Sequence, residues 1–110
     1  MSFNKIRTYH AVIDYVVDGD TCDVLIDLGF HMTTRQRVRL LGIDTPERGQ
    51  EGYHEAKDFL KKYLGKDILV TTVKTGKFGR WLATLHCDKL DVESINDKLL
   101  HNGLAKRYGS

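Results

Sequence analysis

Five short segments rich in β-branched and aromatic residues, separated by glycine and polar residues, are the feature that most constrains the fold. Two of them lie in residues 9–28 and flank Asp18-Gly19, a pair typical of a tight turn between strands. A third is expected over residues 34–43, where arginines alternate with apolar positions. The last two are expected over residues 68–73 and 81–87, joined by a glycine-containing loop.

Two segments have the apolar spacing of helices. The spacing i, i+3, i+4, i+7, i+8 predicts a helix that stops at Gly65 and whose apolar stripe is Ala56, Phe59, Leu60, Tyr63 and Leu64. A second helix is expected from the N-cap Ser94 to Gly103, with Asp97 at the position of a capping box. The order β-β-β-α-β-β-α predicts one α+β domain over residues 1–110, mainly β: a five-stranded barrel of the OB type with two packed helices.

Composition excludes several other classes. The chain has 110 residues, of which 41% are apolar, and no apolar run approaches the roughly 20 residues of a membrane span. Its 17 basic and 15 acidic residues give a net charge of +2, which excludes a disordered charged tail and gives no support to a purely electrostatic nucleic-acid binder.

The N-terminal residues 1–9 contain Lys5 and Arg7 with no apolar run after them, so they are not a secretory signal. We expect a cytoplasmic protein, or a secreted one from which a leader has been removed. The cysteines Cys22 and Cys87 are expected to be reduced, because a core of this size needs no disulfide.

Two polar clusters are candidates for chemistry. The first is Asp18-Gly19-Asp20-Thr21, which by itself is most simply a hairpin turn. The second is Arg39 followed by Asp44-Thr45-Pro46-Glu47, which by itself is most simply a solvated loop. Both clusters follow predicted strands, however, so a barrel can bring Asp20 and Asp44 to one rim.

Two carboxylates held together repel each other unless a cation lies between them. Carboxylate oxygens suit Ca²⁺ or Mg²⁺, and the Thr45 backbone carbonyl could add a ligand. The five histidines are too scattered for a zinc site. The guanidinium groups of Arg39 and Arg80 match phosphate oxygens, and Glu47 could orient or deprotonate a water molecule near the cation.

Taken together, these residues resemble the staphylococcal nuclease (thermonuclease) family. The resemblance runs from about Tyr9 to Ala105 and rests on four blocks in the same order and at the same spacing. These blocks are Val17-Asp18-Gly19-Asp20-Thr21, Val38-Arg39-Leu40-Leu41-Gly42-Ile43-Asp44-Thr45-Pro46-Glu47, Phe78-Gly79-Arg80 with Leu82-Ala83, and Gly103-Leu104-Ala105.

The resemblance implies an OB barrel and a Ca²⁺-dependent endonuclease that cleaves DNA and RNA and leaves 3′-phosphate ends. It implies Ca²⁺ ligands at Asp20, Asp44 and Thr45. Catalytic roles would fall to Glu47 as general base, Arg39 as phosphate clamp and Arg80 as stabiliser of the transition state and leaving group. Asp18 would be an outer-sphere acid.

The remaining expectations are weaker. Lys77, Phe78 and Tyr108 are expected to contact substrate, with Phe78 replacing the family's tyrosine. The family's third, C-terminal helix is expected to be absent. We expect nucleic-acid substrates with single strands preferred, no membrane association and a monomer. Two other functions stay open: a non-catalytic OB module that binds single-stranded nucleic acid, and an interaction domain whose acidic loop is only a solvated turn.

Overall fold

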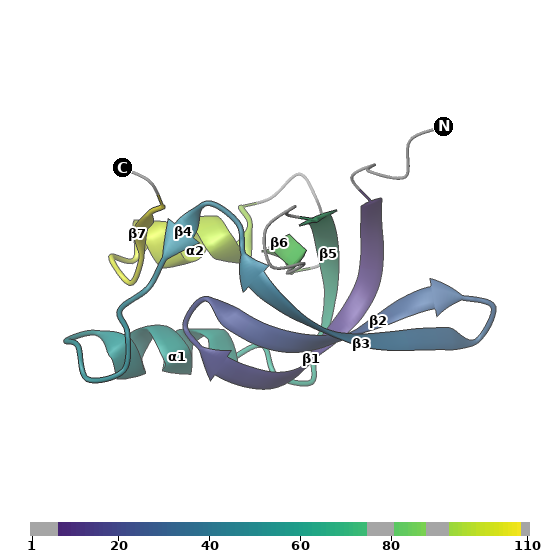
Figure 1. Ribbon diagram of the computed structural model, residues 1–110, viewed down its shortest axis with the longest axis horizontal. Coiled ribbons are helices and arrows are strands. Elements are labelled where there is room, and N and C mark those ends of the chain that lie inside the picture. Colours follow the sequence, from purple (N-terminus) through teal and green to yellow (C-terminus); the bar gives the residue numbers. More distant parts are fainter. Residues whose placement is uncertain (1–6, 75–80, 88–92, 109–110) are drawn as a thin grey trace.

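The computed structural model describes residues 7–74, 81–87 and 93–108, and its long strands close into a barrel in the order β1–β2–β3–β6–β5 (Figure 1). All neighbouring pairs are antiparallel except β3 and β6, which run parallel. The predicted five-stranded barrel is therefore confirmed. The strands are β1 (Arg7–Asp18), β2 (Thr21–Gly29), β3 (Met32–Leu40), β5 (Asp67–Lys74) and β6 (Trp81–His86).

Strand alternation divides the barrel into a buried inner face and an outer face. On β2, Cys22, Val24 and Ile26 point inward and are at most 5% exposed. Both Cys22 and Cys87 are free thiols, and burial raises the pKa of Cys22 to about 12. A register shift between Ile13 and Tyr15 marks a bulge in β1.

The first helix is shorter than the apolar stripe predicts. Helix α1 (Tyr53–Lys61) buries Ala56 and Leu60, but the expected extension to Leu64 is wrong. After Lys61 the chain turns toward β1: the Gly65 N–H donates to the Ile13 carbonyl (3.0 Å), and Leu64 forms a β-bridge with Ile13. Pairing with the barrel therefore replaces the last helical turn, and Leu64 is left 40% exposed.

The second helix follows its sequence signals. Helix α2 (Ile95–His101) begins after Ser94, whose Oγ accepts a hydrogen bond from the Asp97 N–H (3.0 Å). Ile95 and Leu99 are fully buried against the barrel. Gly103 follows the helix with φ +71°, a left-handed conformation that glycine adopts without steric cost.

The structure contains a small second sheet that the sequence did not predict. The expected third strand over residues 34–43 breaks at Leu41-Gly42, and the chain resumes as β4 (Ile43–Asp44). This strand pairs with β7 (Lys106–Arg107), which follows α2. The pairing adds two short strands to the predicted order and brings the end of the chain beside Asp44.

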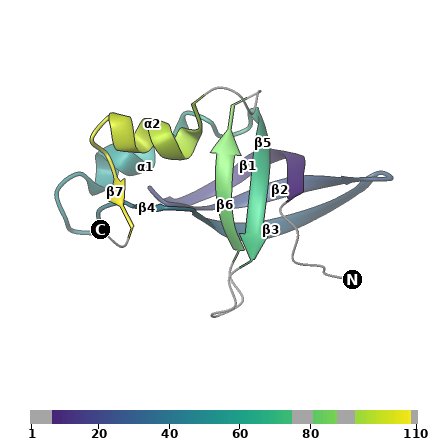
Figure 2. The same cartoon turned by 90° about the horizontal axis from the view of Figure 1, so that it is seen from above.

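The helices and the small sheet lie together at one end of the barrel, and the β2–β3 hairpin projects from the other end (Figures 1 and 2). The turn between β1 and β2 lies at the helical end (Figure 1). Neither helix in the described ranges is long and apolar enough to cross a membrane.

Asn96 fastens α2 to the barrel. Its side chain is buried, accepts a hydrogen bond from the Leu85 N–H (3.0 Å), and donates to the carbonyls of Leu41 (3.0 Å) and Ala83 (3.1 Å). It therefore joins α2, β6 and the break between β3 and β4.

We expect Asn96→Ala to lower the free energy of unfolding by about 2–4 kcal/mol, because it leaves the buried Leu85 N–H without a partner and removes two further hydrogen bonds. Asn102→Ala is the matched control: it removes a single exposed bond, to the Lys98 carbonyl, at the end of the same helix. Urea unfolding of both variants measures the difference. Equal, small losses would show that Asn96 does not hold the helix in place.

Candidate active site

The turn between β1 and β2 presents the first acidic side chain of the site. Asp18 ends β1, and its Oδ1 accepts a hydrogen bond from the Asp20 N–H (3.2 Å). The Asp20 carboxylate accepts from the Thr21 hydroxyl (3.1 Å) and from the Thr45 N–H (3.1 Å). Asp20 is therefore positioned by β2 and by the segment that follows β4.

This arrangement depends on close packing at Gly19. A Cβ atom built on Gly19 would lie 2.7 Å from the Ala56 Cβ and 2.9 Å from the Thr45 Oγ1. The β1–β2 turn, the segment after β4 and helix α1 thus meet at a point with no room for a side chain. Glycine here lets Asp20 approach the Thr45 backbone.

Arg39 joins the two acids that the sequence places on separate strands. Its Nη2 lies 3.4 Å from Asp20 Oδ2 and 3.2 Å from Asp44 Oδ1. Arg39 lies near the end of β3, paired with Thr21 of β2 and Leu82 of β6. The Arg39 side chain is 20% exposed, so these contacts are less screened by water than a surface ion pair.

The neighbouring carboxyl groups of Asp18 and Asp20 shift each other's pKa values in opposite directions. Burial, followed by the hydrogen bond and charge of Asp20, raises the pKa of Asp18 to about 6. Burial alone would raise the pKa of Asp20 too, but hydrogen bonds from Asp18 and from the Thr45 N–H, with the charge of Arg39, hold it below its ordinary value. Asp20 therefore ionises before Asp18 as the pH rises.

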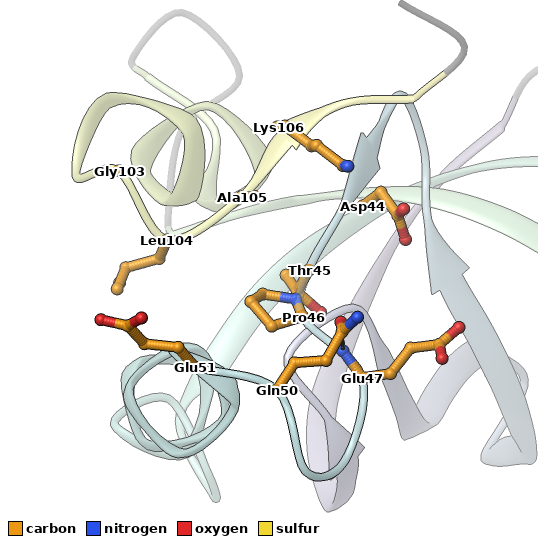
Figure 3. A pocket seen from close by; sticks show the side chains of 10 residues that line it. All are labelled: Asp44, Thr45, Pro46, Glu47, Gln50, Glu51, Gly103, Leu104, Ala105 and Lys106. Atoms are coloured by element: carbon orange, nitrogen blue, oxygen red, sulfur yellow. Dashed lines mark hydrogen bonds between the residues drawn. The ribbon is translucent and has the colours of Figure 1, made fainter.

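Glu47 lies on the exposed loop after Asp44. Its N–H donates to the Gln50 side-chain carbonyl (2.7 Å), and its carbonyl accepts from the Gln50 N–H (2.9 Å). Figure 3 shows the carboxylates of Asp44 and Glu47 on the same side of this loop, whereas Glu51 points the other way. The two hydrogen bonds with Gln50 thus hold the loop, while Glu47 stays exposed to solvent.

A cavity of about 460 Å³ lies beside these acids (Figure 3). The loop after β4 forms one wall and the segment leading to β7 forms the other. Lys106, which pairs with Asp44 across the small sheet, supplies a positive charge at the rim. The residues that line the cavity are Asp44, Thr45, Pro46, Glu47, Gln50, Glu51, Gly103, Leu104, Ala105 and Lys106.

Tyr108 belongs to the same site through the end of the chain. Its N–H donates to the Gly42 carbonyl (3.0 Å), and its ring lies 4.9 Å from the Arg39 guanidinium carbon. Tyr108 as a residue is 65% exposed. Tyr108 therefore supports Arg39 and presents an open aromatic face next to it.

The structure brings together six of the predicted site residues: Asp18, Asp20, Arg39, Asp44, Thr45 and Tyr108. Glu47 lies on the neighbouring loop, with its carboxylate exposed, whereas Lys77, Phe78 and Arg80 lie outside the described residues. Sequence reasoning missed Asn96 and Lys106. A helical asparagine among apolar neighbours was the available signal for Asn96, whereas no local pattern indicates the pairing of Lys106 with Asp44.

The residues present fit a hard divalent cation in their chemistry. Asp20 and Asp44 offer carboxylate oxygens that converge on one nitrogen of Arg39, and the Thr45 Oγ1 beside them is buried without a hydrogen-bond partner. Within the described residues, no three His, Cys, Asp or Glu side chains form a group that could hold a metal ion. A cation here would depend on two carboxylates, a backbone carbonyl and water.

We expect Gly19→Ala to lower the free energy of unfolding by about 1–3 kcal/mol, because the new methyl group overlaps Ala56 and Thr45. Adding Ala56→Gly removes the nearest atom, so the double variant should lose less than the sum of the single variants. Chemical denaturation of the three proteins measures this coupling. Simple additivity would contradict close packing at Gly19.

Comparison with known proteins shows which family the chain resembles. The sequence profile described as Staphylococcal nuclease homologue matches residues 37–110. The micrococcal nuclease of Shigella flexneri is 30% identical over 84% of this chain and 55% of its own length. The thermonuclease of Staphylococcus hyicus is 30% identical over 91% of this chain and 59% of its own length. A protein of Escherichia coli O157:H7 called an uncharacterized endonuclease is 30% identical over 90% of this chain and 61% of its own length.

The chain spans a little over half the length of these three curated relatives. The matched stretch contains Arg39, Asp44, Thr45 and Glu47 and covers more than half of the chain. With that match and the barrel already described, the chain belongs to the staphylococcal nuclease homologue family.

Proposed function

We propose that this protein is a Ca²⁺-dependent nuclease that hydrolyses phosphodiester bonds of DNA and RNA and leaves 3′-phosphate ends. The observation that carries the proposal is the contact of one Arg39 nitrogen with both Asp20 and Asp44. It places a phosphate-binding guanidinium directly beside two oxygen donors for a cation. Membership of a family that includes named nucleases supports the reaction class.

The proposed cation ligands are the carboxylates of Asp20 and Asp44 and the backbone carbonyl of Thr45. A bound Ca²⁺ would neutralise phosphate charge and act as a Lewis acid toward a phosphate oxygen. The chain prepares this site by holding Asp20 ionised and nearly buried, 10% exposed, with bonds from Thr21 and Thr45. Asp18 acts next to Asp20 as an outer acid.

The guanidinium groups stabilise the charge that develops on phosphorus. Arg39 donates to phosphate oxygens, and its stacking on Tyr108 limits its orientation. Arg80 is proposed to stabilise the transition state and the departing 5′-oxygen. Lys77, Phe78 and Tyr108 are proposed to contact the substrate, Lys77 through its charge and the two aromatic rings by stacking.

Glu47 is proposed as the general base. Its exposed carboxylate lies on the same side of the loop as Asp44 (Figure 3), where it can take a proton from an attacking water molecule. The water oxygen then bonds to phosphorus while the bond to the 5′-oxygen breaks, so the phosphate stays on the 3′ side. We further propose that residues 1–110 act as one monomeric domain that prefers single strands, which enter the open site without strand separation.

Digestion assays test the reaction. Addition of Ca²⁺ should release acid-soluble nucleotides from denatured DNA and from RNA, and a chelator should abolish the release. Arg39→Ala and Arg80→Ala should each lower kcat/KM by roughly 10²-fold or more, as loss of a donor to a developing oxyanion does. Strand binding that persists in chelator, without cleavage under any metal condition, would instead establish the non-catalytic OB module.

Glu47→Gln should lower kcat by about 10²–10⁴-fold with little change in KM, because it removes the base and keeps the side-chain shape. Glu51→Gln is the matched control, since Glu51 lines the same cavity but points away from Asp44. Steady-state kinetics with calcium-binding calorimetry separate catalysis from metal affinity. An unchanged kcat for Glu47→Gln, or equal losses for both variants, would remove Glu47 from the mechanism.

A further inference from the structure

The outer face of β3 carries more arginines than the proposed reaction uses. Arg35, Arg37 and Arg39 occupy alternate positions of this strand, so their side chains share one face, while Val38 and Leu40 face the core. The side chains of Arg35 and Arg37 are 54% and 59% exposed. The row therefore continues from Arg39, at the candidate site, along the outside of the barrel.

A nearly buried carboxylate orients these two arginines. Asp23 of β2 is only 5% exposed at its side chain, and it accepts hydrogen bonds from Arg37 Nε (2.8 Å) and Nη2 (3.3 Å). It also forms an ion pair with Arg35 Nη2 (3.2 Å). The hydrogen bond and charge of Arg37 hold the pKa of Asp23 below its ordinary value. Asp23 thus lies beneath the guanidinium groups, and each guanidinium keeps N–H groups for another acceptor.

Apolar and aromatic groups lie between and beside the charges. Tyr15 of β1 pairs with Asp23, which pairs with Arg37, so all three stand in one row across the sheet. Leu25 pairs with Arg35 in the same way. Tyr15 is 54% exposed and Leu25 is 41% exposed. We call Tyr15, Leu25, Arg35 and Arg37 the β3 track.

The spacing of the track suits an extended nucleic-acid strand. Alternate residues of a strand lie about 6.8 Å apart, which is comparable to the separation of successive phosphates in an extended single strand. Exposed aromatic rings stack on bases without regard to sequence, and basic grooves follow the backbone. The β2–β3 hairpin leads away from the helices (Figures 1 and 2), so a strand lying on it extends outward from Arg39.

We propose that the β3 track binds single-stranded nucleic acid without sequence preference, holding the nucleotides that flank the phosphate at Arg39. The inference deepens the proposed function and rests on it for the position of the cleaved bond. Asp14 and Asp23 balance the charges of Arg35 and Arg37. The Asp14 side chain is 48% exposed and pairs with Arg35 Nε at 2.5 Å, so it competes with a phosphate for Arg35 and limits the affinity of the track for nucleic acid.

Binding of a fluorescent 12-nucleotide single strand, measured in chelator, tests the track with one variant that should weaken binding and one that should strengthen it. Arg37→Gln should raise Kd about fivefold or more and lower the salt dependence of binding by roughly one phosphate contact. Asp14→Asn should lower Kd by a few-fold, because it removes one of the two carboxylates that Arg35 contacts. The charge-matched controls are Lys61→Gln and Asp58→Asn, at exposed positions of α1. Thermal unfolding verifies that each variant is folded.

Cleavage of a dinucleotide with Ca²⁺ separates this proposal from the proposed function. A dinucleotide reaches only the Arg39 centre, so its cleavage should be unchanged in Arg37→Gln and Asp14→Asn. If no substrate is cleaved by the wild-type protein, the nuclease proposal fails while the chelator binding still decides the track. The β3 track is overturned if the variants bind the single strand as their α1 controls do. It is also overturned if dinucleotide cleavage changes as much as single-strand binding.

Discussion

The contact of Arg39 with Asp20 and Asp44 is the interaction on which the candidate site depends. It joins the β1–β2 turn, the end of β3 and the short strand β4 at one nitrogen atom. Two carboxylates at this separation repel each other, and the guanidinium offsets that repulsion within the chain itself. A phosphate and a divalent cation require the same groups, so the residues that stabilise this rim are those that a phosphodiester substrate would contact.

The backbone around these side chains explains how they are held. Glycine at position 19 allows the β1–β2 turn to approach Thr45 and α1, and the Thr45 N–H then fixes the Asp20 carboxylate. On the other side, Asn96 ties α2 to the barrel, and the chain after α2 returns as β7 beside Asp44. The site is therefore a junction of the barrel rim with two added segments, and its precision depends on packing some distance from the charges.

Most of the fold could be predicted from local patterns. Strand alternation, the Asp18-Gly19 turn and the Ser94 cap depend on residues near each other in the sequence, and all three were predicted and found. The errors occurred where distant segments compete for the same backbone groups. Residues 62–65 leave the helix where Ile13 offers them a pairing partner. The strand breaks after Leu40, where Gly42 adopts φ +79°, and the residues beyond the break pair with β7.

The sequence by itself determined the barrel class, the two helices, the family and the chemical types gathered at the site, because each depends on short-range periodicity or on motif spacing. Only the tertiary structure decided that one Arg39 nitrogen contacts both acids, that Tyr108 stacks on this arginine, and that Arg35 and Arg37 extend the row over Asp23. Those contacts depend on strand register and on the closure of the barrel. Register is set by the sum of many core contacts, so no single local motif encodes it.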